Sequence, residues 1–472
     1  MVSFSRRGFL RSILLSAMAP SLSHAMSRPT PQDYTGPWAA VPKILDTIQL
    51  PRIPAREFDI RDFGATGGED DSGAFTAALR ACRAAGGGRV VVPPGQYRSG
   101  PIHLGSNTEL HLREGAVLSF IPDPDRYLPP VKTRWEGMEL MGYSPLIYAH
   151  GCENVALTGR GRIDGGADCD TWWPWKGLNT KCAQSSDAGP TQHAARKALF
   201  EDAERGVPVA ERVYADGSYL RPPLVQFYAC RNVLIEDVTL ENAPFWVLHP
   251  VLCESVTVRG ITARSHGPNS DGCDPESCRN VLIENCLFDN GDDCIAIKSG
   301  RNADGRRLAV PSENIVIRDC RMRDGHGGLV LGSEISGGVR NVFLENCTMS
   351  SPNLERGLRI KTNAMRGGEI QHVYVRNVSI GQVKDVIVIN FFYEEGDRGP
   401  YDPDVHDIFV ENLHCERAQR AFHIRGFERA PIRGLHVARS DILRAESVGV
   451  IEQVSGLTVS AVTINGELFK PK

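Results

Sequence analysis

Four short polar runs contain the residues of this chain whose types and spacing could do chemistry. They follow one another about 20 to 35 residues apart in the sequence, which is within the repeat length of solenoid proteins. The runs are Asn269-Ser270-Asp271, Gly291-Asp292-Asp293, Gly325-His326-Gly327 and Arg359-Ile360-Lys361. If each run occupies the same place in one coil of a solenoid, their side chains meet on one groove, because neighbouring strands stand about 4.8 Å apart.

Such a groove would hold three carboxylates, from Asp271, Asp292 and Asp293, beside the imidazole of His326. Like-charge repulsion then keeps a proton on at least one carboxyl group to higher pH. One protonated and one ionised carboxyl group is the pair that hydrolyses a glycosidic bond, because the acid protonates the leaving oxygen and the base activates water. An isolated Asp-Asp pair is more typical of a solvated turn or a calcium site, so the hypothesis depends on the four runs occurring together.

The last run supplies cations. Arg359 and Lys361 are two residues apart in a predicted strand, so both point to its outer face. There they would hold an anionic sugar, since a guanidinium pairs with a carboxylate through two parallel hydrogen bonds. Asn269 and Lys298 lie beside the same stripe and are also predicted to contact the substrate. We predict no metal and no cofactor.

A nine-residue apolar phrase recurs along the chain around these runs, as in Asn232–Leu240, Asn280–Phe288 and Asn341–Met349. Its apolar residues alternate as they do in strands, and an Asn or Asp usually marks the corner in its middle, where unusual backbone angles are tolerated. A third short strand follows in each coil, as at 358–361. Three strands per coil predict an all-β fold, a right-handed parallel β-helix. A β-propeller fits poorly, because its blades have four strands and periods of about 40–50 residues.

The predicted β-helix catalytic domain spans residues 57–472. Asp71 or Ser72 can begin a helix that would plug the open end of the solenoid. Insertions near 121–148, 166–222 and 391–404 interrupt the coils and should lie over the binding face. The second insertion holds three tryptophans, which would either stack on sugar rings or fasten the insertion to the coils: Trp172, Trp173 and Trp175.

The N-terminal sequence is typical of an export signal. Arg6-Arg7 is followed by an apolar run too short to span a bilayer and by a small-x-small site at Ser23-His24-Ala25. Residues 1–25 are therefore predicted to be a twin-arginine signal peptide that directs the protein through the twin-arginine export machinery to the bacterial periplasm or beyond. A short membrane anchor is the alternative. Residues 26–56 form an N-terminal extension outside the coils.

Net charge and cysteine positions limit the binding partners and the disulfides that we expect. A net charge of −4 argues against nucleic acid as a partner. The 13 cysteines would suit disulfides in an exported protein, but six of them recur at fixed places in the phrase, which predicts two stacks of buried thiols. These are Cys230, Cys253 and Cys278, then Cys286, Cys320 and Cys347. We expect a monomer.

The four runs resemble the motifs of family 28 of the glycoside hydrolases, the polygalacturonases. Those motifs are Asn-Thr-Asp, Gly/Gln-Asp-Asp, Gly-His-Gly and Arg-Ile-Lys; Ser270 is the one departure and keeps the hydroxyl group. The resemblance covers roughly residues 56–465 and implies inverting hydrolysis of α-1,4-linked galacturonate in pectin. It also implies roles: Asp292 as general acid, Asp271 and Asp293 as the groups that position and deprotonate water, and His326 as support for the acid. Arg359 and Lys361 would bind the sugar carboxylate.

Several alternatives stay open. The insertions could wall off one end of the groove, and Lys132–Gly137 is similar to bacterial members of the family, so we expect exo-action. A rhamnogalacturonan or xylogalacturonan hydrolase of the same family, a calcium-dependent pectate lyase and a non-catalytic polysaccharide-binding β-helix are the other candidates. Directly stacked carboxylates would stand near 5 Å apart, which is typical of retention; the resemblance favours inversion.

Overall fold

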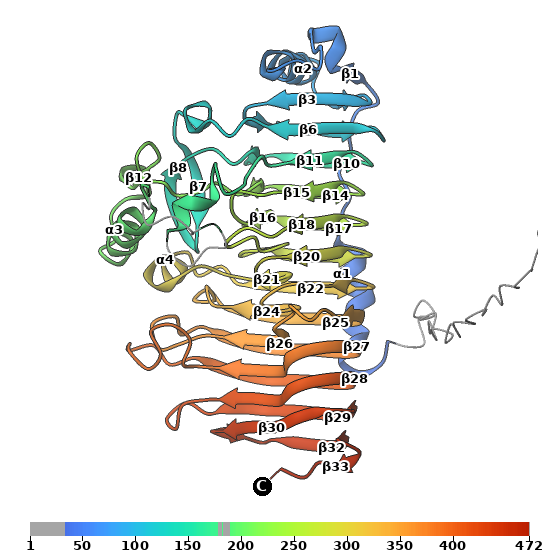
Figure 1. Ribbon diagram of the computed structural model, residues 1–472, viewed down its shortest axis with the longest axis vertical. Helices are drawn as coiled ribbons and strands as arrows, with labels where there is room; N and C mark the ends of the chain where they lie inside the picture. The colour runs from blue at the N-terminus through green and yellow to red at the C-terminus, as the bar shows by residue number, and fades with distance from the viewer. Residues whose placement is uncertain (1–33, 178–181, 183–188, 472) are drawn as a thin grey trace, which may run out of the picture.

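Parallel strands stacked in coils form a single right-handed β-helix in the computed structural model, which describes residues 34–177, 182 and 189–471. The predicted fold class is confirmed. Figure 1 shows the coils rising in one column, with α2 (Ser72–Ala84) at one end and β33 (Glu467–Leu468) at the other. The predicted signal peptide lies outside the described residues. Within them, none of the helices has the length and apolarity needed to cross a membrane.

The strands form three faces, and the four longest described strands turn from one face to the next. The first face contains β1 (Glu57–Asp59), β2 (Gly88–Val92), β5 (Thr108–Leu112), β10 (Glu153–Gly159), β14 (Arg231–Glu236), β17 (Glu254–Arg259), β19 (Arg279–Glu284), β22 (Ser312–Arg318), β25 (Val339–Met349), β27 (Glu369–Asn390), β28 (Asp404–Arg425), β29 (Ile432–Ile442) and β32 (Thr458–Ile464). The second face contains β3 (Gly95–Ser99), β6 (Ala116–Phe120), β11 (Arg162–Asp164), β15 (Thr239–Glu241), β18 (Thr262–Ser265), β20 (Leu287–Asn290) and β23 (Arg321–Met322) before it joins β25.

The third face carries the polar runs. It contains β4 (Ile102–His103), β9 (Ile147–His150), β13 (Val225–Tyr228), β16 (Leu248–Val251), β21 (Ile295–Ile297), β24 (Leu329–Gly332), β26 (Arg356–Lys361) and β30 (Ala445–Glu452), with parts of β27 and β28 between the last two. The short β31 (Val454–Ser455) pairs with β29, and β33 pairs with β32.

The core is built by residues that occupy the same place in successive coils. Val233, Val256, Val281 and Ile315 are paired in register along the first face, and each is fully buried. Full burial of such a side chain stabilises the fold by roughly 1.5–3 kcal/mol, so the stack gains stability at each coil. The two predicted thiol stacks are confirmed, since all six cysteines are buried and free. The one disulfide in the described residues joins Cys169 to Cys182 in the second insertion.

Left-handed backbone marks the corners of the coils. The predicted corner position is occupied by residues such as Asn285, Asn346 and Asn377, with φ of 56°, 55° and 54°. The phrase also begins on a left-handed residue, for example Asn314 with φ of 57°. This conformation at the start of the phrase was not predicted from the sequence. Asn is one of the few residues that tolerates this region. Its amide also bonds from coil to coil, as Asn314 Nδ2 donates to Asn280 Oδ1 at 3.0 Å.

Helices and short strands cover the ends and sides of the column. The predicted plug is confirmed as α2, although Asp71 does not cap it: its carboxylate accepts from the backbone of Thr66 and Gly67 instead. The helix α1 (Ala40–Thr47) precedes the coils in the sequence but packs on the outside of the first face, against Leu282, Val316 and Phe343. The other helices and 3-10 turns are η2 (Gly36–Ala39), η3 (Ile60–Phe63), η4 (Pro124–Tyr127), η5 (Trp173–Lys176), α3 (His193–Glu204), η6 (Val209–Glu211) and α4 (Asn302–Leu308).

The first two insertions stand out from one side of the column, near its middle (Figure 1). Their strands β7 (Val131–Trp135), β8 (Met138–Gly142) and β12 (Val213–Tyr214) form a small separate sheet. A second apolar cluster, which includes Trp135, Leu140, Leu199 and Phe245, packs this sheet and α3 together. The insertions are therefore folded parts of the molecule, positioned beside the third face.

Candidate active site

Strand register on the third face brings the four polar runs together. Cys273 pairs with Ile295, Ile295 pairs with Leu329, and Leu329 pairs with Leu358. Asp271 and Asp293 each lie two residues before one of these paired positions, so they stack one coil apart. Arg359 and Lys361 follow Leu358, two coils beyond Asp293. They pair with Val330 and Gly332 of the coil between, which are small enough to leave room beside the cations.

The three carboxylates form one compact cluster. Each of Asp271, Asp292 and Asp293 offers an oxygen atom within 4.8 Å of the others. Asp293 accepts from Lys361 Nζ at 2.7 Å and from Arg359 Nη1 at 3.3 Å. Because Lys361 already places a positive charge against Asp293, the cluster is balanced by cations of the protein itself. The geometry that the sequence predicted for these residues is present.

His326 lies against Asp292. The His326 Nδ1 atom is 2.8 Å from Asp292 Oδ1, and the backbone N–H of His326 donates to the carbonyl oxygen of Asp292 at 3.1 Å. A second donor to Asp292 Oδ1 is the backbone N–H of Asp293 at 2.9 Å. Asp292 is half-buried and the His326 side chain is 47% exposed, so this pair faces the open side of the cluster.

The environments of the carboxyl groups separate their pKa values. Burial, followed by the charge of Asp292, raises the pKa of Asp271 to about 8. Burial alone would also raise the pKa of Asp292 and of Asp293, but His326 holds the first below its ordinary value, and Lys361 and Arg359 hold the second below it. Asp292 in turn raises the pKa of His326 to about 9. Near neutral pH the cluster therefore contains a protonated Asp271, an ionised Asp293 and one proton within the Asp292–His326 pair.

Lys298 lies behind the carboxylates. Its Nζ atom is 3.5 Å from Asp271 Oδ2, 3.6 Å from Asp274 Oδ2 and 3.3 Å from Glu334 Oε2, and it sits 4.5 Å from the ring centre of Trp246. Its side chain is only 3% exposed. These contacts show Lys298 neutralising the buried acids; its predicted contact with substrate stays a prediction.

Asn269 and Ser270 shape the loop that carries Asp271. The buried Arg221 donates to Asn269 Oδ1 at 2.8 Å and to the carbonyl oxygen of Pro268 at 2.7 Å. Ser270 Oγ donates to the carbonyl oxygens of Ser265 and Gly267 at 2.6 and 2.7 Å. The hydroxyl group that Ser270 shares with threonine therefore fixes the loop. Arg221 could not be assigned to the site from the sequence, because it belongs to the irregular second insertion.

A cavity of about 660 Å³ opens above the cluster, and all three insertions contribute to its walls. Glu136 comes from the first insertion, Trp173, Lys176 and Arg196 from the second, and Tyr393 from the third. Tyr393 lies beside both cations, with its ring centre 5.5 Å from the Arg359 guanidinium and 5.2 Å from Lys361 Nζ. Neither Tyr393 nor Lys176 could be assigned to the site from the sequence, because insertions have no repeat from which a position can be inferred.

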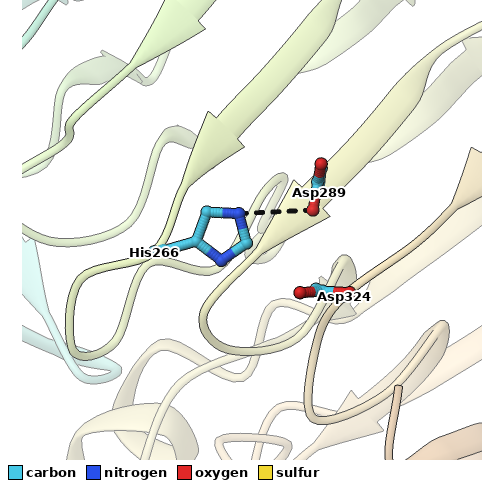
Figure 2. Close-up of side chains that lie close together, drawn as sticks. All are labelled: His266, Asp289 and Asp324. Carbon is cyan, nitrogen blue, oxygen red and sulfur yellow. Dashed lines mark ion pairs between the residues drawn. The ribbon is translucent and has the colours of Figure 1, made fainter. Parts of the chain in front are cut away.

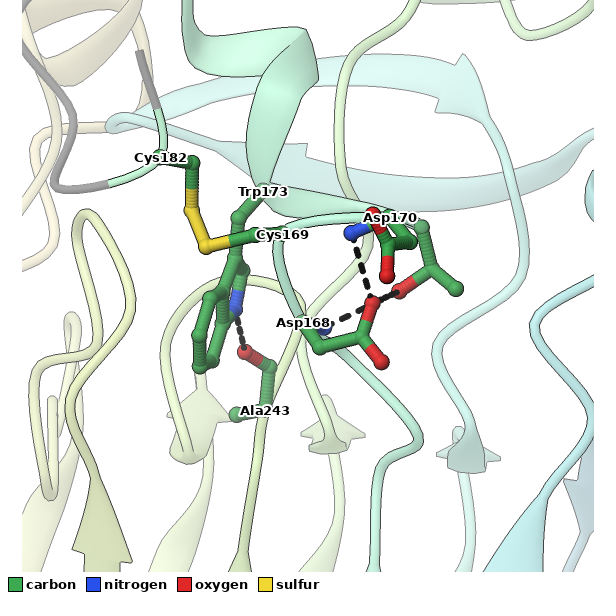
Figure 3. Close-up of a disulfide and its surroundings, with 7 residues drawn as sticks. Asp168, Cys169, Asp170, Trp173, Cys182 and Ala243 are labelled. Carbon is green, nitrogen blue, oxygen red and sulfur yellow. Dashed lines mark hydrogen bonds between the residues drawn. A yellow bond between two sulfur atoms is a disulfide. The ribbon is translucent and has the colours of Figure 1, made fainter. Parts of the chain in front are cut away.

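Of the three tryptophans of the second insertion, Trp173 lines the cavity and the other two pack on tyrosines of the insertions, while stacking on a sugar ring stays a prediction. Trp173 lines the cavity and donates from Nε1 to the carbonyl oxygen of Ala243 at 3.0 Å, next to the Cys169–Cys182 disulfide (Figure 3). Trp172 is buried against Tyr127, with ring centres 5.4 Å apart. Trp175 packs on Tyr219 and thus fastens the insertion.

Buried ion pairs tie the walls of the cavity to the coils. Arg301 and Arg366 are almost completely buried, and both pair with Glu394, at 3.0 and 2.8 Å. Arg301 also reaches Glu136 and Glu334 at 3.4 Å. The first and third insertions are therefore held to α4 and its surroundings by charge-assisted hydrogen bonds, which are stronger than neutral ones.

A second group of side chains that could bind a cation lies at the edge of the cavity. Figure 2 shows His266 pointing at Asp289, with Nε2 3.2 Å from Oδ1, and Asp324 next to them. Arg264 and Arg323 each approach Asp289 at 3.9 Å, and Asp324 accepts from Ser351 and Asn353. The carboxylates of this group are thus already engaged by protein groups.

Comparisons with known proteins agree with this geometry. The sequence profile of Glycosyl hydrolases family 28 matches residues 214–463. Among solved structures, a hyperthermoactive exopolygalacturonase from Thermotoga maritima is similar, with 46% identity, a TM-score of 0.88 and coverage of 91% of this chain and 96% of that chain. A probable polygalacturonase of Vitis vinifera is 28% identical over 85% of this chain and 77% of its own length. An exo-poly-alpha-D-galacturonosidase of Dickeya chrysanthemi is 25% identical over 74% of this chain and 58% of its own length.

The profile match covers more than half of the chain, and its span includes all four polar runs. The similarity to the Thermotoga maritima structure extends over nearly the whole of both chains. Fold, site geometry and sequence similarity lead to the same assignment. The chain belongs to family 28 of the glycosyl hydrolases.

Proposed function

We propose that the protein is an exo-acting polygalacturonase, which hydrolyses α-1,4-linked galacturonate at the ends of pectic chains. The observation that carries the proposal is the cluster of Asp271, Asp292 and Asp293 beside Arg359 and Lys361. It combines protonated and ionised carboxyl groups, which glycoside hydrolysis needs, with cations suited to a sugar carboxylate. Two of the similar proteins are named as exo-acting enzymes on galacturonate, which supports the mode of action.

In the proposed mechanism, Asp292 donates the proton that it shares with His326 to the glycosidic oxygen, and the bond from that oxygen to C1 breaks. A water molecule loses a proton to a carboxylate and forms the new bond to C1 from the opposite face. Asp293 can accept that proton directly, because Lys361 and Arg359 keep it ionised. Asp271 becomes a base only after losing its own proton, whose pKa is raised to about 8.

The raised pKa of Asp271 makes it the rival candidate for the general acid, and leaving-group dependence distinguishes the two. We expect Asp292→Asn to lower kcat on polygalacturonate by about 10²–10⁴-fold. On an aryl galacturonide whose leaving group needs no proton, the loss should be much smaller. Asp271→Asn should lose activity on both substrates. The opposite pattern, with Asp271→Asn spared on the aryl substrate, would assign the acid to Asp271.

We infer inversion from the resemblance to the family alone. The distances within the cluster do not favour inversion. The oxygens that lie within 4.8 Å of one another are closer to the spacing of retaining enzymes, about 5–5.5 Å between carboxyl groups, than to the 6.5–9.5 Å of inverting ones. Proton NMR of the first product from an α-linked substrate decides the question. Initial release of the β-anomer supports inversion, and initial release of the α-anomer contradicts it.

The walls that the insertions build around the cavity support action at chain ends, since an endo-acting enzyme needs a groove open at both ends. Product analysis on polygalacturonate tests this. An exo-acting enzyme releases one short product from the earliest times, whereas a ladder of mixed oligomers at early times means endo-action. The same experiment on rhamnogalacturonan and xylogalacturonan identifies the preferred polymer.

A pectate lyase would need an arginine that acts as a base. Burial alone would lower the pKa of Arg359, but Asp293 raises it above its ordinary value, so this guanidinium stays protonated. A lyase would form unsaturated products that absorb ultraviolet light and would stop when calcium is chelated; the proposed hydrolase releases reducing sugar with or without chelator. Binding of the polymer without turnover would instead indicate a non-catalytic β-helix.

We also propose that residues 1–25 direct export by the twin-arginine route, and that the mature protein starts near Met26 and acts as a monomer in the periplasm or outside the cell. The support is the Arg6-Arg7 pattern with its cleavage site. Replacing both arginines with lysine in the full chain should leave the protein in the cytoplasm. Export of the doubly substituted chain at the normal rate would contradict this route.

A further inference from the structure

The cations that line the cavity differ in whether the protein itself neutralises them. Five are paired with a carboxylate at 2.7 to 3.3 Å: Arg196, Lys298, Arg301, Arg359 and Lys361. The sixth is Lys176, which lines the same cavity. In the part of the chain that the structure describes, no carboxylate pairs with Lys176 and no hydrogen bond reaches its ammonium group.

The backbone of Lys176 is held in a turn, although no described residue pairs with its side chain. Lys176 is the last residue of η5, and the turn is fixed from inside by Trp172, which is buried against Tyr127. The carbonyl oxygen of the preceding Trp175 accepts from the backbone of Gln192 at 2.8 Å. The turn that carries the lysine is therefore anchored to neighbouring parts of the molecule by Trp172 and by the hydrogen bond to Trp175.

No carboxylate of the described residues forms an ion pair with the ammonium group of Lys176, although Glu136 and Asp292 act on it from a distance. Burial lowers its pKa, and although Glu136 and Asp292 act in the opposite direction, the guanidinium groups of Arg221 and Arg196 lower it further. Lys176 lines the same cavity as Asp271 and Asp292 of the carboxylate cluster. An anionic group bound beside Lys176 would supply the missing counter-charge.

We propose that Lys176 binds the carboxylate of the sugar that neighbours the one held by Arg359 and Lys361. This inference rests on the proposed function, because polygalacturonate carries one carboxylate on every sugar. Arg359 and Lys361 account for one of the two carboxylates that flank the scissile bond, and Lys176 is the cation left to pair with the other. The site then requires free-acid galacturonate on both sides of that bond and discriminates against a methyl-esterified or neutral neighbour.

The test compares full-length wild type, Lys176→Met and Lys176→Arg on digalacturonate and on its two mono-methyl esters. Lys176→Met should lower kcat/KM on digalacturonate by about 10- to 100-fold, mainly through KM, because a charge-assisted contact is lost. On one of the two esters, wild type and Lys176→Met should be equal, since that substrate lacks the carboxylate that Lys176 would bind. Lys176→Arg should keep most of the wild-type preference for the free acid.

Lys197→Met is the matched control, because Lys197 is 81% exposed on α3 and pairs only with Glu201 among the described residues; it should behave as wild type. The inference is overturned if Lys176→Met matches wild type on every substrate, or loses the same factor on digalacturonate and on both esters. A wild type that cleaves none of the three overturns the proposed function, and the inference with it. If wild type cleaves the substrates and Lys176→Met has the same kinetics, the inference is overturned and the proposed function stands.

Discussion

At the level of single residues, the proposed chemistry depends on the proton that Asp292 and His326 share. The two side chains are 2.8 Å apart, and each shifts the pKa of the other in the direction that favours an ion pair. The pair therefore acts as one acid, which holds its proton to higher pH than an isolated carboxyl group would. Its position at the open side of the cluster lets it reach a glycosidic oxygen in the cavity.

This arrangement predicts the basic side of the pH profile. In the wild type, kcat/KM should fall as the pH rises through about 9, where His326 loses its proton. In His326→Gln the proton is held by Asp292 alone, so the fall should move to lower pH. The control His414→Gln removes an imidazole that pairs with Asp441 at 2.7 Å on the C-terminal coils and should leave the profile unchanged. A fall at the same pH in wild type and His326→Gln would mean that another group, such as Asp271, loses the critical proton.

The corners of the coils are the elements that keep the polar runs in register. Asn314 has φ of 57°, donates to Asn280 Oδ1 and accepts from Asn341 Nδ2, both at 3.0 Å. A one-residue change of register would move every side chain of a strand to the opposite face. The ladder of Asn side chains therefore supports the alignment of the coils that carry Asp292, His326 and Arg359.

Substitutions at Asn314 separate its backbone contribution from its hydrogen bonds. Asn314→Ala should lower the free energy of unfolding more than Asn314→Gly by about 1 kcal/mol, because alanine is strained in the left-handed region and glycine is not. Both variants should be less stable than wild type, since both lose the amide bonds to the neighbouring coils. Urea denaturation followed by circular dichroism measures the difference. Equal stability of the two variants would show that the corner conformation contributes little.

At the scale of the whole molecule, the repeat made the coils and the carboxylate cluster predictable from the sequence. Asp271, Asp292, Asp293 and His326 could be aligned because each occupies a fixed place in a coil. Tyr393, Lys176 and Arg221 could not, because they come from insertions whose folds depend on distant contacts. The helix α1 could not be predicted either. Its packing partners Leu282, Val316 and Phe343 lie more than 200 residues away in the sequence.

The walls around the cavity give the last prediction, which concerns the molecule as a whole. Glu394 and Glu395 connect the third insertion to Arg301 and Arg366, which are almost fully buried. In the double variant Glu394→Gln and Glu395→Gln, the buried Arg366 loses both carboxylates that pair with it, while Arg301 keeps Glu136 and Glu334. The segment that carries Tyr393 should loosen, so KM for oligogalacturonides should rise.

On polygalacturonate, the same double variant should release longer oligomers in addition to the short product of the wild type, because the wall no longer blocks the groove. Chromatography of early products measures the change. The control Glu69→Gln alters a side chain that is 96% exposed near the N-terminal end of the column and should keep the wild-type products. If the double variant keeps both the wild-type KM and the wild-type products, the buried ion pairs do not set the mode of action, and the wall must be held by the apolar contacts of the first two insertions.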